Sequence, residues 1–381
     1  MKRGVALVTL CAIAFGLTYA DHAPLIPLVA AEFGLSDVEA GLLSTAVFLS
    51  YLIVTLATAG WIVRIPPKRV IAAGLAFAIV GAALFAVAPS YAFAIAAKGL
   101  QGLGSAVAFV SAQRYVAGLY GARRSHFGLG LYGAGFPFGS AVALVAMPAL
   151  AQASGAWRSA FAIEAALIGA VLLAWLTTPA VAASQPPGDI RDAFRCRNCW
   201  WTSLQHAAGF GLGLSAGTWI TVYLLREFSL PLTVSGLLGS SLLVMAVAGR
   251  TGGGWLASRE HLASKPTMRA AAVAVLAGAA LLALPGRPLA LALLGGVLVG
   301  IGVGFPYSAL FNTAEASLPE APGAAQGLTA TGGTAGAMIG APVMGLAVQT
   351  YGFAAAWAYL AVVALVAFAA TFAMRGEEDF R

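Results

Sequence analysis

The chain alternates long apolar stretches with short polar segments. A helix needs about 20 apolar residues to cross a bilayer, and each stretch is long enough to do so once. Pro and Gly mark many of the boundaries, as at Pro66-Pro67, and Ser36 with Glu39 forms a capping box. The pattern predicts twelve transmembrane helices, at 5–30, 38–63, 70–88, 91–119, 126–153, 158–178, 200–225, 233–256, 267–285, 289–316, 325–350 and 353–374.

Composition supports a membrane protein. Of 381 residues, 60% are hydrophobic and only 9% are charged, whereas an ordinary soluble domain carries about 25% charged residues. Twelve spans with short connections leave no room for a catalytic domain outside the membrane. We therefore expect lipid to be the main surroundings of the chain.

The basic residues predict the orientation. Lys and Arg total 21 against 14 Asp and Glu, but they are scattered between apolar stretches, so we expect no nucleic-acid partner. With the N-terminus inside, fifteen basic residues fall in cytoplasmic loops and three, Arg158, Arg226 and Arg287, in outer loops. The excess predicts that both termini face the cytoplasm, and we expect a bacterial inner membrane. Residues 1–20 also resemble a secretory signal peptide, which would leave eleven spans.

The chain divides into two related halves. The longest polar stretch, Thr178 to Cys199, has six predicted helices on either side, and Gly60-Trp61 at the end of the second helix recurs as Gly254-Trp255 at the end of the eighth. Repeated halves that meet at the bilayer midplane are typical of secondary transporters. The predicted fold class is an all-α membrane protein with two pseudo-symmetric six-helix bundles, at 1–178 and 200–381, joined by a cytoplasmic linker at 179–199.

Two motifs make the chain resemble the major facilitator superfamily of secondary transporters. The segment from Gly60 to Arg69 is similar to the loop signature of that family, but it lacks the acidic residue, and Ser258 stands at the corresponding place in the second copy. The segment from Lys98 to Gly104 resembles an Arg-x-x-Gln-Gly-x-Gly signature, with Lys in place of Arg. The resemblance implies alternating access, and it implies proton coupling through the second motif. The drug antiporter signature is only faintly present around Pro137.

Charged residues in the predicted spans are the candidate site. Asp21 and Lys98 lie roughly 13 and 10 Å below the outer face, so they can form an ion pair that protonation or an anionic substrate breaks; a static pair is the alternative. Gln101 shares a helix face with Lys98, and His22 adjoins Asp21. In the second half, His206 and Arg250 each lie roughly 9 Å from the inner face. The set is Asp21, His22, Lys98, Gln101, His206 and Arg250, all for substrate binding or coupling, with no catalytic or metal-binding residue expected.

Other residues are weaker candidates for the functional site. Five aromatic residues either line the pathway or belong to interfacial belts: Tyr19, Tyr132, Trp219, Tyr223 and Tyr307. Loop pairing or snorkelling explains four polar residues: Arg114, Glu164, Asn312 and Glu315. Cys196 and Cys199 supply two of the four ligands that zinc needs, so we expect no metal. Glycines spaced by four predict close helix packing in the second half: Gly209/Gly213/Gly217, Gly296/Gly300/Gly304 and Gly332/Gly336/Gly340.

These observations predict a proton-coupled symporter for a small organic or inorganic anion, with no cofactor. Its partners would be a small-molecule substrate, protons and the lipid bilayer, and we expect a monomer. The alternative is an exporter of drugs, lipids or metabolites, in which Asp21 would attract cationic cargo. An enzyme is not expected, because no His-Glu-x-x-His or Gly-x-Ser-x-Gly element occurs.

Overall fold

The computed structural model describes residues 2–58, 62–120, 126–181, 190–257 and 263–380, which contain helices and no strand. Twelve candidate membrane spans lie among these residues, and each coincides within a few residues with a predicted span. The chain is therefore an integral membrane protein, as its hydrophobic pattern predicts. Arg123, Arg124, Ser258, Arg259 and the pair Gly60-Trp61 lie outside the described residues.

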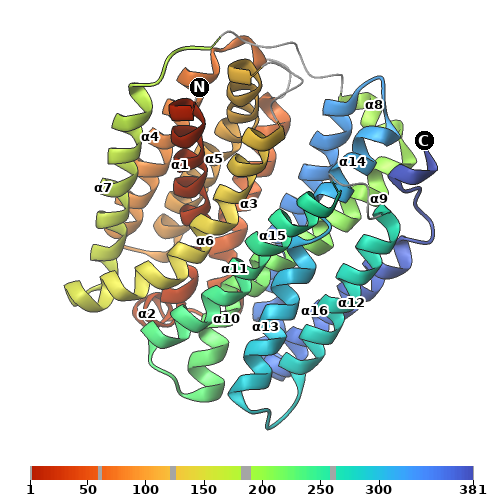
Figure 1. Cartoon of the computed structure of the whole chain (residues 1–381). Helices are drawn as coiled ribbons and strands as arrows, with labels where there is room; N and C mark the ends of the chain where they lie inside the picture. The colour runs from red at the N-terminus through yellow and green to blue at the C-terminus, as the bar shows by residue number, and fades with distance from the viewer. Residues whose placement is uncertain (1, 59–61, 121–125, 182–189, 258–262, 381) are drawn as a thin grey trace. The chain divides into compact units, whose positions relative to one another are not determined.

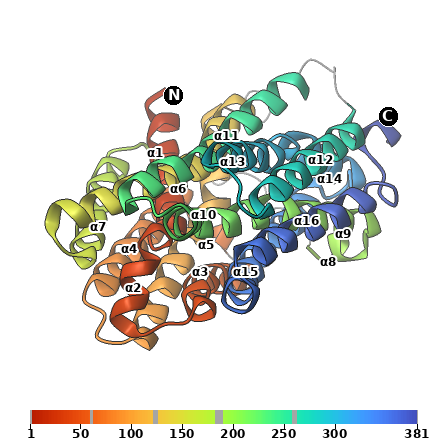
Figure 2. The same ribbon diagram turned by 90° about the horizontal axis from the view of Figure 1, so that it is seen from below.

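The chain folds as two units, shown from two directions in Figures 1 and 2. Residues 1–186 and 231–237 form unit 1, and residues 187–230 and 238–381 form unit 2. The helices that begin in the first segment are α1 (Lys2–Ala20), α2 (Ile26–Phe33), α3 (Asp37–Thr58), α4 (Pro67–Ala86), α5 (Tyr91–Tyr120), α6 (His126–Ser154) and α7 (Trp157–Leu176). The later helices are α8 (Ile190–Arg195), α9 (Arg197–His206), α10 (Leu212–Phe228), α11 (Leu232–Ala257), α12 (Ser264–Ala283), α13 (Leu289–Gly304), α14 (Tyr307–Ser317), α15 (Pro322–Tyr351) and α16 (Phe353–Ala370).

Three spans are interrupted rather than continuous α-helices. In the first, α1 ends at Ala20 and a 3₁₀ turn at Ala23–Leu25 leads into α2. Pro24 favours this break because it has no backbone N–H and fits the first turn of a helix. In the tenth, Phe305 and Pro306 separate α13 from α14, and in the seventh a π-helix at Ala207–Gly211 joins α9 to α10. Helix irregularities of this kind frequently occur at functional sites.

The predicted close approach of helices in the second half is present at most of the glycines. A Cβ added at Gly300 or Gly304 would overlap a carbonyl oxygen of α11, and one at Gly332 would overlap a carbonyl oxygen of α9. Gly296, in contrast, has no atom within 4 Å of such a Cβ. Absence of a side chain therefore brings α13 against α11 and α15 against α9, which sets the spacing around the polar groups of unit 2.

Polar contacts secure the helix ends of unit 1. The predicted capping box is confirmed, since the backbone N–H of Ser36 donates to Glu39 Oε2 at 2.8 Å and that of Glu39 donates to Ser36 Oγ at 3.3 Å. Near the end of α2, Glu32 accepts a hydrogen bond of 2.7 Å from Trp157 Nε1 and pairs with Arg158. These contacts join α2 to the start of α7.

The C-terminal segment docks on the beginning of α12. Glu378 accepts hydrogen bonds from the backbone N–H and hydroxyl of Ser264 at 2.9 and 2.6 Å, and Asp379 pairs with Lys265 at 2.6 Å. Burial acts to raise the pKa of Glu378, but the bonds from Ser264 and Lys265 outweigh it and hold this pKa below 4.5. The Lys265 side chain likewise lowers the pKa of Asp379 below 3.8. Two carboxylates at a helix N-terminus also complement its dipole.

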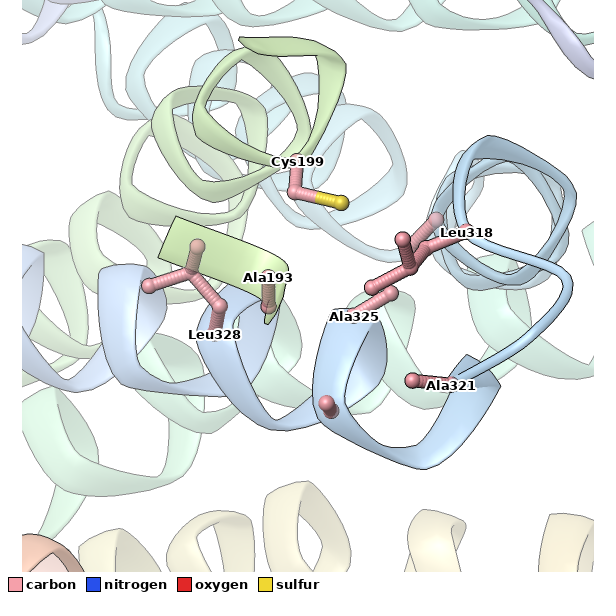
Figure 3. Packing of buried hydrophobic residues seen from close by; sticks show 8 residues of the cluster. Ala193, Cys199, Leu318, Ala321, Ala325 and Leu328 are labelled. Atoms are coloured by element: carbon pink, nitrogen blue, oxygen red, sulfur yellow. The ribbon is translucent and has the colours of Figure 1, made fainter. Parts of the chain in front are cut away.

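The Cys-x-x-Cys element belongs to an apolar cluster, shown in Figure 3. Cys199 is buried against Ala193 of α8, Ala314 of α14, Leu318 directly after α14 and Leu328 of α15. Cys196 donates from Sγ to the carbonyl of Ser317 at 3.5 Å, and both thiols are free. Among the described residues, no three His, Cys, Asp or Glu side chains are grouped in a way that could hold a metal ion. Part of the segment expected as a linker is therefore helical and packed.

Candidate functional site

Asp21 and His22 occupy the break in the first span, between α1 and the 3₁₀ turn. Both side chains are fully buried in unit 1. The bend frees backbone polar groups and lets short polar side chains turn into the bundle instead of following the helix surface. Pro24, which interrupts the helix after α1, therefore helps to place the carboxylate of Asp21 and the imidazole of His22 inside unit 1.

Lys98 of α5 meets Asp21 in a fully buried ion pair. Its Nζ also donates to the carbonyl of Thr18 at 3.1 Å and to Gln101 Oε1 at 2.5 Å. An ammonium has three N–H donors, and here each of them has an acceptor. The ion pair expected from the depths of the two residues is therefore present, while its role in binding or coupling remains a prediction.

Asp21 is surrounded by donors on both carboxylate oxygens. Oδ1 accepts from Lys98 and from the backbone N–H of His22 at 2.6 Å, and His22 Nδ1 lies 3.1 Å away. Oδ2 accepts from Gln101 Nε2 at 3.1 Å. The other His22 nitrogen contacts Ser44 Oγ of α3 at 2.9 Å. This shell stabilises the ionised form of the carboxylate in a dry environment.

Gln101 bridges the two charges. Its oxygen accepts from Lys98 and its nitrogen donates to Asp21, so both ends of the amide are used within the pair. Gln101 packs closely on α4, because a Cβ at Gly81 would lie 2.6 Å from its Cγ. In this conformation the amide orients the lysine rather than offering a free donor.

Glu164 of α7 lies in the same interior, and here the sequence-based interpretation is wrong. Its side chain is 1% exposed, so it neither snorkels nor pairs with a loop. It shares the buried face of α7 with Phe161 and Ile168, and its carboxyl interacts electrostatically with Asp21 and Lys98. Among the described residues, no N–H or hydroxyl group donates to either of its oxygens, and its side-chain hydrogen-bonding interaction is with the Asp21 carboxylate.

A second polar group lies in unit 2, where two interrupted spans meet α11. His206 ends α9 directly before the π-helix, and its Nδ1 lies 3.0 Å from the carbonyl of Thr329. Its Nε2 is buried and has no hydrogen-bond partner within the described parts of the chain. The ring stacks on Phe210 at 5.3 Å. Within the described residues, the imidazole thus has one polar atom that is not used in a hydrogen bond.

Arg250 of α11 faces this imidazole. Its guanidinium lies 4.3 Å from the ring centre of Tyr307 and 5.8 Å from that of Phe210, and it interacts electrostatically with His206. Tyr307 begins α14 directly after the Pro306 break. The two aromatic faces hold the guanidinium by cation–π attraction.

The other aromatic candidates serve mainly as packing. Tyr19 lies between Phe48 and Phe136, with ring centres 5.2 and 5.8 Å away. The remaining three donate to backbone carbonyls of neighbouring helices: Tyr132 to Phe109, Trp219 to Ala341 and Tyr223 to Leu282. These bonds hold helices together within their own unit.

The polar residues near helix ends differ in burial and in their contacts. Arg114 is buried and donates from Nη1 to the carbonyl of Ile62 at 3.3 Å. Glu315 is exposed and accepts from Gln326, and Asn312 is also exposed. Contacts with neighbouring segments account for Arg114 and Glu315, in agreement with the sequence analysis.

Known proteins share both the sequence pattern and the fold. The sequence profile of the Major Facilitator Superfamily matches residues 8–341. A bacterial homolog of the human lysosomal transporter Spinster, solved in inward-facing unoccupied and occupied conformations, has a TM-score of 0.77 in both. The unoccupied form is 16% identical, and the match covers 97% of this chain and 96% of that one. A variant of the nucleoside transporter NupG has a TM-score of 0.75 at 16% identity, covering 98% and 99% of the two chains. No curated protein matches in sequence.

Proposed function

Because the chain belongs to the major facilitator superfamily, we propose that it moves a small anion by proton-coupled alternating access. The structural neighbours are transporters, and twelve spans accommodate the two six-helix bundles that such a mechanism rocks against each other. We further propose that it lies in a bacterial inner membrane, with both termini cytoplasmic and the monomer as the working form. The fifteen to three distribution of basic residues supports this orientation.

The observation that carries the proposal is the buried ion pair of Asp21 and Lys98. All three N–H donors of Lys98 are satisfied, one of them by the carboxylate of Asp21. A substrate carboxylate or oxyanion can bind the ammonium by replacing that carboxylate. Proton uptake by the cluster favours the replacement, because it removes the negative charge that competes with the substrate. Anion and proton would then move together, which is symport.

The group in unit 2 supports an anionic substrate independently. An unused Nε2 of His206 and a guanidinium held on the face of Tyr307 provide donors suited to a carboxylate or oxyanion. Cation–π contact with Tyr307 holds the guanidinium of Arg250 in position. We propose Arg250 and His206 as substrate contacts.

Transport by protein reconstituted in liposomes tests the proposal. With an imposed pH gradient, labelled carboxylates and inorganic oxyanions are screened for uptake by the native protein, Lys98→Ala, Asp21→Asn and Arg195→Ala, an exposed cation used as control. Loss of a charge-assisted hydrogen bond of about 1.5–3 kcal/mol predicts roughly 10–100-fold weaker uptake for Lys98→Ala. The control should match the native protein.

Normal transport by both Lys98→Ala and Asp21→Asn would show that the site assignment is wrong. Transport that is insensitive to Lys98→Ala and inhibited by cations would instead favour the exporter, in which Asp21 binds cationic cargo.

A further inference from the structure

The buried cluster of unit 1 contains two carboxyl groups and one lysine. Asp21 and Glu164 both interact with Lys98, and each of the three side chains is at most 1% exposed. If both carboxyls were ionised, the lysine could compensate only one of them. A second uncompensated carboxylate at this depth is costly. The charge count therefore calls for a proton at one of the two carboxyls, or for a second cation.

Hydrogen bonding decides which carboxyl holds the proton. Asp21 receives donors from Lys98, Gln101 and the backbone of His22, whereas Glu164 receives none within the described residues. Donors stabilise the ionised form, and a dry, donor-free environment stabilises the neutral form. We propose that Glu164 is the proton-carrying carboxyl of this cluster and that Asp21 stays ionised while it is paired with Lys98.

The other titratable groups around Glu164 do not change this assignment. His22, on the segment that follows α1, is the possible second cation, but its ring contacts Asp21 and Ser44 rather than Glu164. On α4, the titratable residues Lys68 and Arg69 belong to the first turn, and Lys68 donates to the carbonyls of Leu176, the last residue of α7, and of Thr178 just after it. On the described part of α6, Tyr132 donates to a carbonyl of α5. On α1, Arg3 donates to Thr177 just after α7, and Cys11 and Tyr19 are buried. On α7 itself, Arg158 pairs with Glu32.

The proton on Glu164 can couple transport to pH, and this role rests on the proposed function. Loss of the proton creates a second carboxylate beside Asp21 that competes for Lys98, and regain of the proton restores a single ion pair. In the proposed alternating access, water that reaches the cluster when the two bundles rock can accept the proton and return it. A protonated Glu164 therefore couples the charge of the cluster to pH without direct protonation of the paired Asp21.

Infrared spectroscopy of the purified protein tests the proton assignment without any substrate. At pH 7 the native protein should show a carboxylic C=O stretching band that shifts in D₂O and is absent from Glu164→Gln. Glu164→Asp should keep a band at a changed frequency, whereas Asp21→Glu should leave the band unchanged. Glu32→Gln removes a carboxylate that pairs with Arg158, and it serves as the control that keeps the band. A native protein without the band, or a band that follows Asp21→Glu, overturns the proposal.

Liposome assays test the coupling separately. Glu164→Gln should retain exchange of labelled for unlabelled substrate, but its accumulation under a pH gradient should fall to the level measured without a gradient. Accumulation equal to that of the native protein would show that the Glu164 proton is static and would refute the coupling role. If no substrate is ever transported, the proposed function fails while the infrared result still decides where the proton lies.

Discussion

Removing the lysine from the buried ion pair should destabilise the protein by a predictable amount. In Lys98→Met the side chain keeps a similar length, but Asp21 loses its counter-ion while it stays fully buried. Breaking a buried pair from one side typically costs about 3–5 kcal/mol, because the remaining charge is uncompensated. For a folding unit of this size, that corresponds to a fall of roughly 6–20 °C in the unfolding temperature.

A double-mutant cycle separates the pair from the rest of the cluster. Asp21→Asn combined with Lys98→Met removes both charges, so the double variant should be no less stable than Lys98→Met alone. Unfolding in detergent, followed by circular dichroism or intrinsic fluorescence, measures all variants. Lys265→Met removes the cation of the partly solvated pair with Asp379, and it should unfold close to the native temperature.

Two results would refute the reasoning. If Lys98→Met unfolds at the native temperature, the pair does not carry the charge balance of the interior. If the double variant loses as much as the sum of the two single variants, Asp21 and Lys98 stabilise the protein independently, and the geometry of their contact has no energetic meaning.

Three further changes have expected outcomes. Gly333→Ala places a Cβ against Nδ1 of His206, so we expect the protein to be destabilised by about 1–3 kcal/mol in unfolding experiments. We also expect it to bind substrate more weakly. Binding as tight as that of the native protein would show that the position of the His206 ring is unimportant. Docking of the C-terminal segment on α12 lowers the pKa values of Glu378 and Asp379, so the segment should stay docked at neutral pH and detach as the pH falls below about 4. Detachment is measured as faster digestion by carboxypeptidase. A digestion rate that is independent of pH would contradict this prediction. Cys199 is buried in an apolar cluster, so a maleimide should label it only after unfolding, and rapid labelling of the folded protein would show that the cluster opens.

The spans were predictable because hydrophobic length is a strong local signal. The breaks inside them were harder, although two of the three have a sequence signal. Pro24 and Pro306 lie within predicted spans at 5–30 and 289–316, and a proline at such a place interrupts a helix unless neighbouring groups compensate. The π-helix after His206 has no comparable signature, because it depends on the packing of α9 and α10 against α15.

The candidate site was predictable where depth alone sufficed. Asp21 and Lys98 were paired from their distances to the outer face, and the same arithmetic applies to Glu164. Lys98 and Glu164 each lie seven residues after the start of their helix, at Tyr91 and Trp157, so they share a depth of roughly 10 Å. Loop pairing or snorkelling was the wrong interpretation of Glu164, because its spacing from Phe161 and Ile168 indicates a buried face.

The docked C-terminal segment has a practical consequence for protein engineering. Arg375 is held through its backbone N–H by Asn198 at 2.8 Å, and Glu378 covers the first residue of α12. A fluorescent protein or affinity tag fused directly after residue 381 would have to be accommodated beside these contacts. Fusions should therefore include a flexible spacer, and a tag that lowers expression or solubility without one would reveal how much the tail contributes to holding the second unit together.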